Sequence, residues 1–293
     1  MTRTPSEAST GPAKRDRAGE ASTGSAKRDR ASAERSEHRS RGAGPRELER
    51  PARLYLVVQR EISRLLSPIS LTLIWIALRF VRGYRIERLA EVRRESREIR
   101  ARSSAPILVC ANHLTMIDSF LIAWALGNPL WLILHFSALP WNVPERLNFA
   151  ARPWQKAAIY VLKCIPIHRG GQRSEVAGVL TRVAHLLGGN ESVLIFPEGG
   201  RSRSGRVEIS NAATGVGRVI RSFPDCRVLC VYLRGERQRA YSFLPERGDR
   251  FYAAVSEIEP KTDAVGLRGS RDLVRQVVRR LSEMETEYFD GRE

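Results

Sequence analysis

From residue 105 onward, short apolar segments alternate with segments of helix length, and this rhythm constrains the fold more than any other feature of the sequence. The short segments are rich in apolar and β-branched residues, as buried strands are. We expect six strands, at 107–112, 130–135, 164–169, 192–198, 227–234 and 251–258. Strands separated by helices predict an α/β domain with a central, mostly parallel or mixed sheet flanked by helices on both faces.

The chain of 293 residues is long enough for one such domain with appendages. We place this domain at 105–293. Within it, the segments 176–187 and 272–284 carry apolar residues at helical spacing and are expected to pack on the sheet.

Residues 1–52 contain almost no large apolar side chains and cannot bury enough surface to offset the entropy of ordering. We therefore expect a disordered basic tail. A polar segment that begins at Glu7 recurs at Glu20, but two polar copies are too few to build a repeat fold. The basic clusters of this tail could contact nucleic acid or anionic lipid, although a solvated flexible tail accounts for them better.

Residues 53–104 change abruptly in composition and predict two helical pieces separated near Pro68. The uncharged apolar part, 69–78, is shorter than the roughly 20 residues that span a bilayer. It is followed by Arg79, Arg82, Arg85 and Arg88. We expect a membrane-associating helical segment that lies at the interface, with its guanidinium groups on anionic lipid. The alternative is a helix packed on the protein's own core.

The formal net charge of +17 implies an anionic partner, which could be a phospholipid surface, a phosphorylated substrate or a nucleic acid. The four cysteines are Cys110, Cys164, Cys226 and Cys230. They form no CxxC pair and lie mostly in apolar runs, which disfavours a zinc site or a disulfide framework. The first apolar run long enough for a signal peptide begins only after residue 64, so we expect a protein on the cytoplasmic face of a membrane.

The segment ILVCANHLTMID places His113 after an apolar strand and Asp118 five residues later. On one helix this separation would turn the side chains about 140° apart, so they meet only if a turn precedes the helix that contains Asp118. Thr115 is the expected N-cap of that helix, which offers a structural explanation for Asp118. The functional alternative is a His/Asp pair, in which the carboxylate fixes the imidazole and leaves one ring nitrogen free to take a proton.

No GxSxG motif supplies a serine nucleophile, and Cys110 lies inside an apolar strand, where a thiol is poorly reactive. The simplest use of His113 and Asp118 is therefore to deprotonate an acceptor alcohol for direct attack on an activated acyl group.

A second motif, SVLIFPEGGRSRSG at 192–205, turns a strand into a glycine-rich loop that carries Glu198 and Arg201. Such a loop resembles an anion cradle, although a basic surface turn would have the same composition. It lacks the spacing and the Lys-Ser/Thr end of a Walker A loop. A third element places His168 and Arg169 at a strand end, where open α/β sheets bind ligands.

These three elements, in this order, resemble the glycerolipid acyltransferase family, typified by 1-acylglycerol-3-phosphate acyltransferase. Residues 112–118 (NHLTMID) are similar to the family's NHxSxxD block, and 196–202 (FPEGGRS) to its FPEGTRS block. Residues 167–169 are similar to the segment that supplies an arginine between the blocks. The resemblance covers about residues 105–235.

The resemblance implies that His113 is the general base and that Asp118 orients it. It also implies a pocket for the acceptor's phosphate lined by Arg169, Glu198, Gly199 and Arg201. The implied acyl donor is acyl-CoA or acyl carrier protein, with no metal and no further cofactor. The expected reaction transfers a fatty acyl group from the thioester to a lysophospholipid at a phospholipid surface, with 1-acylglycerol-3-phosphate as first choice and no nucleic acid involved.

Three departures from the family pattern bear on the acceptor and the acyl chain. Gly200 stands where the family usually has threonine, 228–233 lacks the common Val-Pro-Val pattern, and 135–163 lacks the expected lysine-containing segment. The alternatives are a family member that acts on another lyso-lipid or a non-catalytic protein that binds anionic membranes or nucleic acid.

Overall fold

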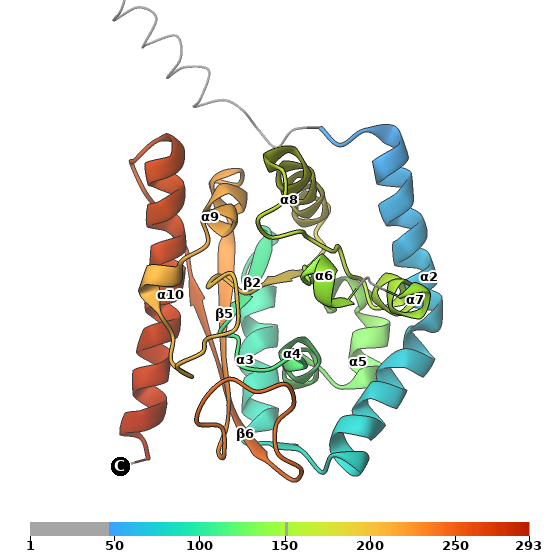
Figure 1. Cartoon of the computed structure of the whole chain (residues 1–293), viewed down its shortest axis with the longest axis vertical. Helices are drawn as coiled ribbons and strands as arrows, with labels where there is room; N and C mark the ends of the chain where they lie inside the picture. Colours follow the sequence, from blue (N-terminus) through green and yellow to red (C-terminus); the bar gives the residue numbers. More distant parts are fainter. Residues whose placement is uncertain (1–46, 150–151, 293) are drawn as a thin grey trace, which may run out of the picture. The chain divides into compact units, whose positions relative to one another are not determined.

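A computed structural model describes residues 47–149 and 152–292 of the chain (Figure 1). Most of the predicted tail, residues 1–46, lies outside the described residues. Its predicted end at residue 52 falls inside the first described helix, α2 (Arg50–Ile76).

The strands form one six-stranded sheet in the order β1-β6-β5-β2-β4-β3. They are β1 (Arg85–Ile86), β2 (Ile107–Ala111), β3 (Trp141–Asn142), β4 (Val193–Ile195), β5 (Arg227–Gly235) and β6 (Arg250–Ile258). Neighbouring strands from β5 to β3 run parallel, whereas β6 pairs antiparallel with β5 and parallel with β1. The predicted α/β fold with a mixed sheet is therefore confirmed.

Side chains that alternate along β5 belong to two apolar cores, one on each face of the sheet. Val228 and Cys230 pack in the first core, and Leu229 and Val231 pack in the second. The first core includes residues of α8 (Arg173–Gly188), α9 (Thr214–Arg221) and α10 (Gly266–Asp290). The second includes residues of α3 (Leu89–Ala101) and α4 (Asp118–Leu126). The two predicted packing helices are confirmed as parts of α8 and α10.

Two of the predicted strands are wrong. The segment 130–135 falls almost wholly within a helix, α5 (Pro129–Leu134), because the Asn128 side chain accepts a 2.7 Å hydrogen bond from the Trp131 amide and Pro129 occupies the first turn. The segment 164–169 makes only isolated bridges to the chain near β3. The remaining short helices are η2 (Phe136–Ala138), α6 (Arg146–Phe149), α7 (Pro153–Val161) and η3 (Ile209–Asn211).

Helix α2 continues through Pro68 and ends in a π-helical turn, η1 (Ala77–Val81), so the predicted break near Pro68 is wrong. Proline has no amide hydrogen and leaves the carbonyl four residues earlier without its helical donor. The hydroxyl of Ser67 donates a 2.8 Å hydrogen bond to that carbonyl, on Arg64. This local replacement allows the helix to continue.

The helix from Arg50 to Val81 is long and apolar enough to cross a membrane by length and composition, which the shorter predicted segment, 69–78, was not. Unlike a helix in the core of a soluble protein, α2 turns polar side chains inward, since Gln59, Ser63 and Ser67 are buried. The outward side chains include Leu65, Ile69 and Leu73, which are 78%, 63% and 60% exposed. Helix α2 is therefore a candidate membrane-associating segment. Figure 1 shows it at the opposite edge of the described residues from α10.

Candidate active site

The turn between β2 and α4 brings His113 and Asp118 into contact, in the one arrangement that their spacing allows, with His113 in the turn and Asp118 at the start of the helix. The His113 Nδ1 atom lies 2.9 Å from Asp118 Oδ2. Asp118 is itself the first residue of α4, and Ile117 precedes it as the N-cap. The predicted N-cap role of Thr115 is therefore wrong, because Thr115 lies in the turn and bonds to Asp118 from outside the helix.

The Asp118 carboxylate is buried and accepts hydrogen bonds from several donors of the turn. The Leu114 and Thr115 amides donate to Oδ2 over 2.6 Å and 2.8 Å, and the Thr115 hydroxyl donates to Oδ1 over 2.5 Å. An ionised carboxylate only accepts hydrogen bonds, so the His113 Nδ1 atom carries the proton in this contact. The Nε2 atom of His113 is left as the basic ring nitrogen.

The backbone and ring of His113 are also fixed by other elements. The side chain of Asn112 donates to the Leu233 carbonyl over 2.9 Å and accepts from the Leu233 amide over 2.8 Å, which ties the end of β2 to β5. The His113 ring stacks on Phe196 with 3.9 Å between centroids, and its carbonyl accepts from the Ser202 amide over 2.9 Å. The two predicted motifs therefore meet at His113.

The glycine-rich loop after β4 buries Glu198. Its Oε2 atom accepts a 3.3 Å hydrogen bond from the Glu208 amide, and its buried Oε1 atom has no hydrogen-bond partner among the described residues. Burial raises the pKa of Glu198 to about 7. Gly199 adopts a positive φ of 72°, and a Cβ atom built on Gly200 would meet no atom within 4 Å.

A cavity of about 480 Å³ brings together three of the predicted site residues, His113, Arg169 and Arg201. Arg169 donates to the Gly199 carbonyl through Nη1, and its burial lowers the pKa of the guanidinium. The Arg201 guanidinium lies over the Tyr241 ring, 5.0 Å from its centroid. Asp118, Glu198 and Gly199 are not among the lining residues of the cavity. Asp118 contacts the cavity residue His113, and the Gly199 carbonyl contacts the cavity residue Arg169. Glu198 precedes Gly199 in the loop.

The rest of the cavity wall is largely apolar and includes Phe120, Trp154, Ile159, Leu162 and Phe243. A smaller apolar cavity shares Phe120 and Leu162 with it and continues to Ile74 and Trp75 at the end of α2. The site therefore joins two cationic side chains, a basic imidazole and the Glu145 carboxylate to an apolar space.

Glu145 also lines the cavity and was not predicted from the sequence, since it lies in the stretch that departs from the family pattern. Its carboxylate accepts a 3.1 Å hydrogen bond from the Arg169 amide and lies 3.7 Å from Arg169 Nε. No local sequence pattern identifies Glu145, because its partner Arg169 lies 24 residues later in the chain.

The thiols and possible metal ligands add no further chemistry to this site. Burial raises the pKa of Cys164, Cys226 and Cys230 to about 12 and also raises that of Cys110. Within residues 47–149 and 152–292, no group of three or more His, Cys, Asp or Glu side chains is arranged to hold a metal ion.

The chain matches a known family model. The acyltransferase family model matches residues 91–256, more than half of the chain, and this range contains both motifs and the whole of the cavity's polar side. A comparison with the curated proteins finds no match. The chain belongs to the acyltransferase family, as its resemblance to the glycerolipid acyltransferases predicted.

Proposed function

We propose that the protein transfers a fatty acyl group from an acyl thioester to the free hydroxyl of a lysophospholipid. The acceptor is 1-acylglycerol-3-phosphate, which gives phosphatidic acid. The observation that carries this proposal is the cavity that joins His113 and two arginines to an apolar wall. A lyso-lipid with a phosphate, a hydroxyl and a hydrocarbon chain matches these three features.

In this mechanism, Nε2 of His113 takes the proton of the acceptor hydroxyl while its oxygen attacks the thioester carbonyl carbon. A carbon–oxygen ester bond forms and the carbon–sulfur bond breaks as the tetrahedral intermediate collapses. The proton passes from His113 to the leaving thiolate, so the base is regenerated. Asp118, 2.9 Å from Nδ1, stabilises the imidazolium between these steps.

Arg169 and Arg201 are the proposed phosphate ligands, because forked guanidinium donors suit phosphate oxygens and both line the cavity with His113. Gly199 and Glu198 support them, since the Gly199 carbonyl accepts from Arg169 and Glu198 precedes it in the loop. The donor is acyl-CoA or acyl carrier protein, and the apolar wall accommodates acyl chains.

We also propose that the protein works on the cytoplasmic face of a phospholipid membrane. The apolar face of α2 is exposed, while Gln59 and Ser63 on its other face donate to backbone carbonyls of the catalytic domain. A helix with one face bonded to a folded domain and its apolar face exposed is suited to lie along the membrane surface.

The test is thiol release from oleoyl-CoA in the presence and absence of 1-acylglycerol-3-phosphate, on vesicles of phosphatidylethanolamine and phosphatidylglycerol. His113→Ala should lower the acceptor-dependent rate by at least ~10²-fold, the lower end of general-base contributions. His135→Ala, at an exposed histidine, is the matched control and should keep the wild-type rate.

Near-full activity of a folded His113→Ala protein would rule out this mechanism. Sedimentation of the same samples tests the membrane proposal, which fails if active protein stays in the supernatant.

A second acceptor is favoured by the open space at Gly200, where the family usually has threonine. A different headgroup could occupy this space. A panel of lysophospholipids with the same donor separates the two candidates, since only the correct acceptor should give thiol release that depends on His113.

A further inference from the structure

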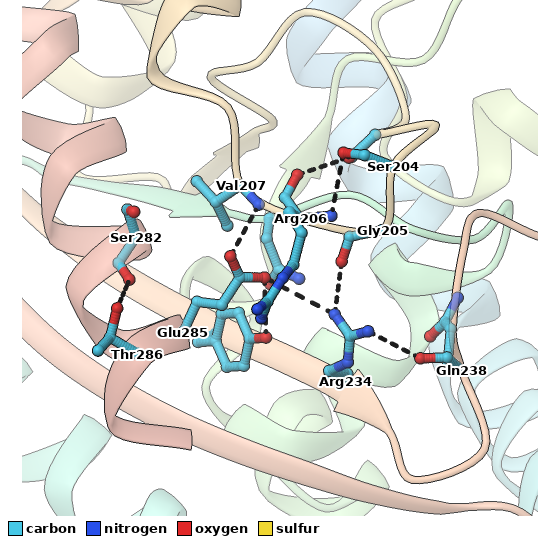
Figure 2. Close-up of polar contacts among 12 residues, drawn as sticks. Ser204, Gly205, Arg206, Val207, Arg234, Gln238, Ser282, Glu285 and Thr286 are labelled. Carbon is cyan, nitrogen blue, oxygen red and sulfur yellow. Dashed lines mark hydrogen bonds and ion pairs between the residues drawn. The ribbon is translucent and has the colours of Figure 1, made fainter. Parts of the chain in front are cut away.

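Behind the glycine-rich loop, a buried ion pair joins the end of β5 to the C-terminal helix (Figure 2). Arg234 of β5 and Glu285 of α10 are both buried, and Arg234 Nη1 lies 3.7 Å from Glu285 Oε1. Burying two charges is costly unless their remaining hydrogen-bonding groups also find partners. Two of the partners in this case are backbone atoms of the loop, and the others are the Gln238 carbonyl and the Tyr232 hydroxyl.

Figure 2 shows how both charged groups hold the loop backbone. Arg234 donates to the Gly205 carbonyl over 2.5 Å and to the Gln238 carbonyl over 2.9 Å. Glu285 accepts a 3.0 Å hydrogen bond from the Val207 amide. The two ends of the ion pair therefore fix backbone atoms that are two residues apart in one loop.

The approach of the loop to this pair depends on Gly205, which has a φ of 72°. A Cβ atom at this position would lie 2.4 Å from the Arg239 carbonyl oxygen, so only glycine lets the two backbone segments lie this close.

The other end of the same loop contacts the candidate active site. The Ser202 amide donates to the His113 carbonyl, and the Ser202 hydroxyl donates to the Arg206 carbonyl over 2.5 Å. Arg201 precedes Ser202 and lines the cavity. A continuous set of contacts therefore connects Glu285 on α10 to Arg201 and His113.

We propose that Arg234 and Glu285 are positioning residues that hold Arg201 where it meets the acceptor's phosphate, an inference that rests on the proposed function. Neither residue is among the lining residues of the cavity, so they act only through the loop. Their effect should fall on the acceptor and spare the thioester donor.

The test variants are Arg234→Lys and Glu285→Gln. Lysine keeps the charge but lacks the planar fork that serves two carbonyls at once, while glutamine keeps an acceptor for the Val207 amide and loses the charge. The matched control is Glu283→Gln, which removes an exposed carboxylate on the same helix that pairs with Arg280.

Two measurements are made on the full chain. Hydrogen–deuterium exchange with mass spectrometry should show faster exchange at 199–208 in both test variants and not in the control. The KM for 1-acylglycerol-3-phosphate should rise about 10-fold or more, within what loss of positioning costs. The KM for oleoyl-CoA should stay unchanged.

Unchanged exchange at 199–208, or an equal rise of both KM values, would overturn the positioning role. The exchange measurement needs no substrate. A wild-type protein that fails to acylate 1-acylglycerol-3-phosphate would therefore count against the proposed function, while the exchange result would still decide whether the ion pair holds the loop. If Arg234→Lys does not fold, Glu285→Gln alone decides the question.

Discussion

The two segments that meet at His113 are held in place in different ways. In the turn 113–118 the contacts of Asp118 are local, because its donors all come from His113, Leu114 and Thr115, while the turn backbone also bonds to Ser202, Ser242 and Phe243. The loop 196–208 is fixed from a distance, by Arg234 and Glu285. The contact between His113 and Asp118 therefore depends mainly on residues that are close in sequence. The loop depends on the packing of the whole domain.

The two buried carboxylates of these segments differ in the same way. Asp118 accepts from four donors, whereas Glu198 accepts one 3.3 Å hydrogen bond and has an oxygen without a partner among the described residues. Burial, only partly offset by the backbone amides of Glu208 and His113, raises the pKa of Glu198 to about 7. The turn therefore fully satisfies its acidic group, and the loop leaves its acidic group close to a change of protonation at neutral pH.

The largest effect is expected from Asp118→Asn, which attacks the locally fixed segment. An amide presents an NH₂ group where the carboxylate has an oxygen, so the His113 ring loses the partner that sets its tautomer. We expect kcat to fall by ~10²–10⁴-fold with little change in the acceptor KM. Steady-state kinetics with oleoyl-CoA and 1-acylglycerol-3-phosphate measure both constants.

The exposed Asp225 gives the matched control, Asp225→Asn, which should keep the wild-type kcat. A folded Asp118→Asn protein with less than a tenfold loss would mean that the turn does not orient the base.

A smaller effect is expected from Arg201→Ala, which acts on the distantly fixed segment. Loss of one phosphate ligand should raise the acceptor KM by about 10–100-fold and leave the donor KM unchanged. Arg203→Ala is the control, because Arg203 is exposed, lies in the same loop and is not among the cavity residues. Equal effects of the two variants would show that the loop contributes only general positive charge.

This contrast also explains what the sequence could predict. His113 and Asp118 lie five residues apart in one turn, so their contact follows from local geometry, and the strands at 107–112, 192–198, 227–234 and 251–258 follow from their apolar runs. The pairing of Arg234 with Glu285 depends on how β5 meets α10, which no local pattern encodes.

Two local signals were outweighed by others. The apolar composition of 130–135 predicts a strand, but Asn128 and Pro129, just before this run, cap and start a helix. Pro68 predicts a helix break, but the Ser67 hydroxyl donates to the Arg64 carbonyl that the proline leaves without a donor, and periodicity does not reveal this contact.

The smallest effect is expected from Glu198→Gln and concerns stability. The pKa of Glu198 rises from an ordinary 4.5 to about 7 on folding, so the folded chain binds more protons than the unfolded chain between these pH values. The contribution of this group to the free energy of unfolding is therefore full below pH 4.5 and is lost as pH rises through 7. Glutamine does not titrate in this range and removes this loss. The free energy of unfolding of the variant should therefore rise relative to that of the wild type between pH 5 and pH 8, by on the order of 2 kcal/mol.

Urea unfolding at pH 5 and pH 8 measures this difference, with Glu283→Gln as an exposed control whose curve should follow the wild type. Parallel pH dependence in the Glu198→Gln and wild-type proteins would mean that Glu198 gains a partner that compensates its burial. The two carboxylates would then be satisfied alike, and the contrast between turn and loop would rest on Arg234 and Glu285 alone.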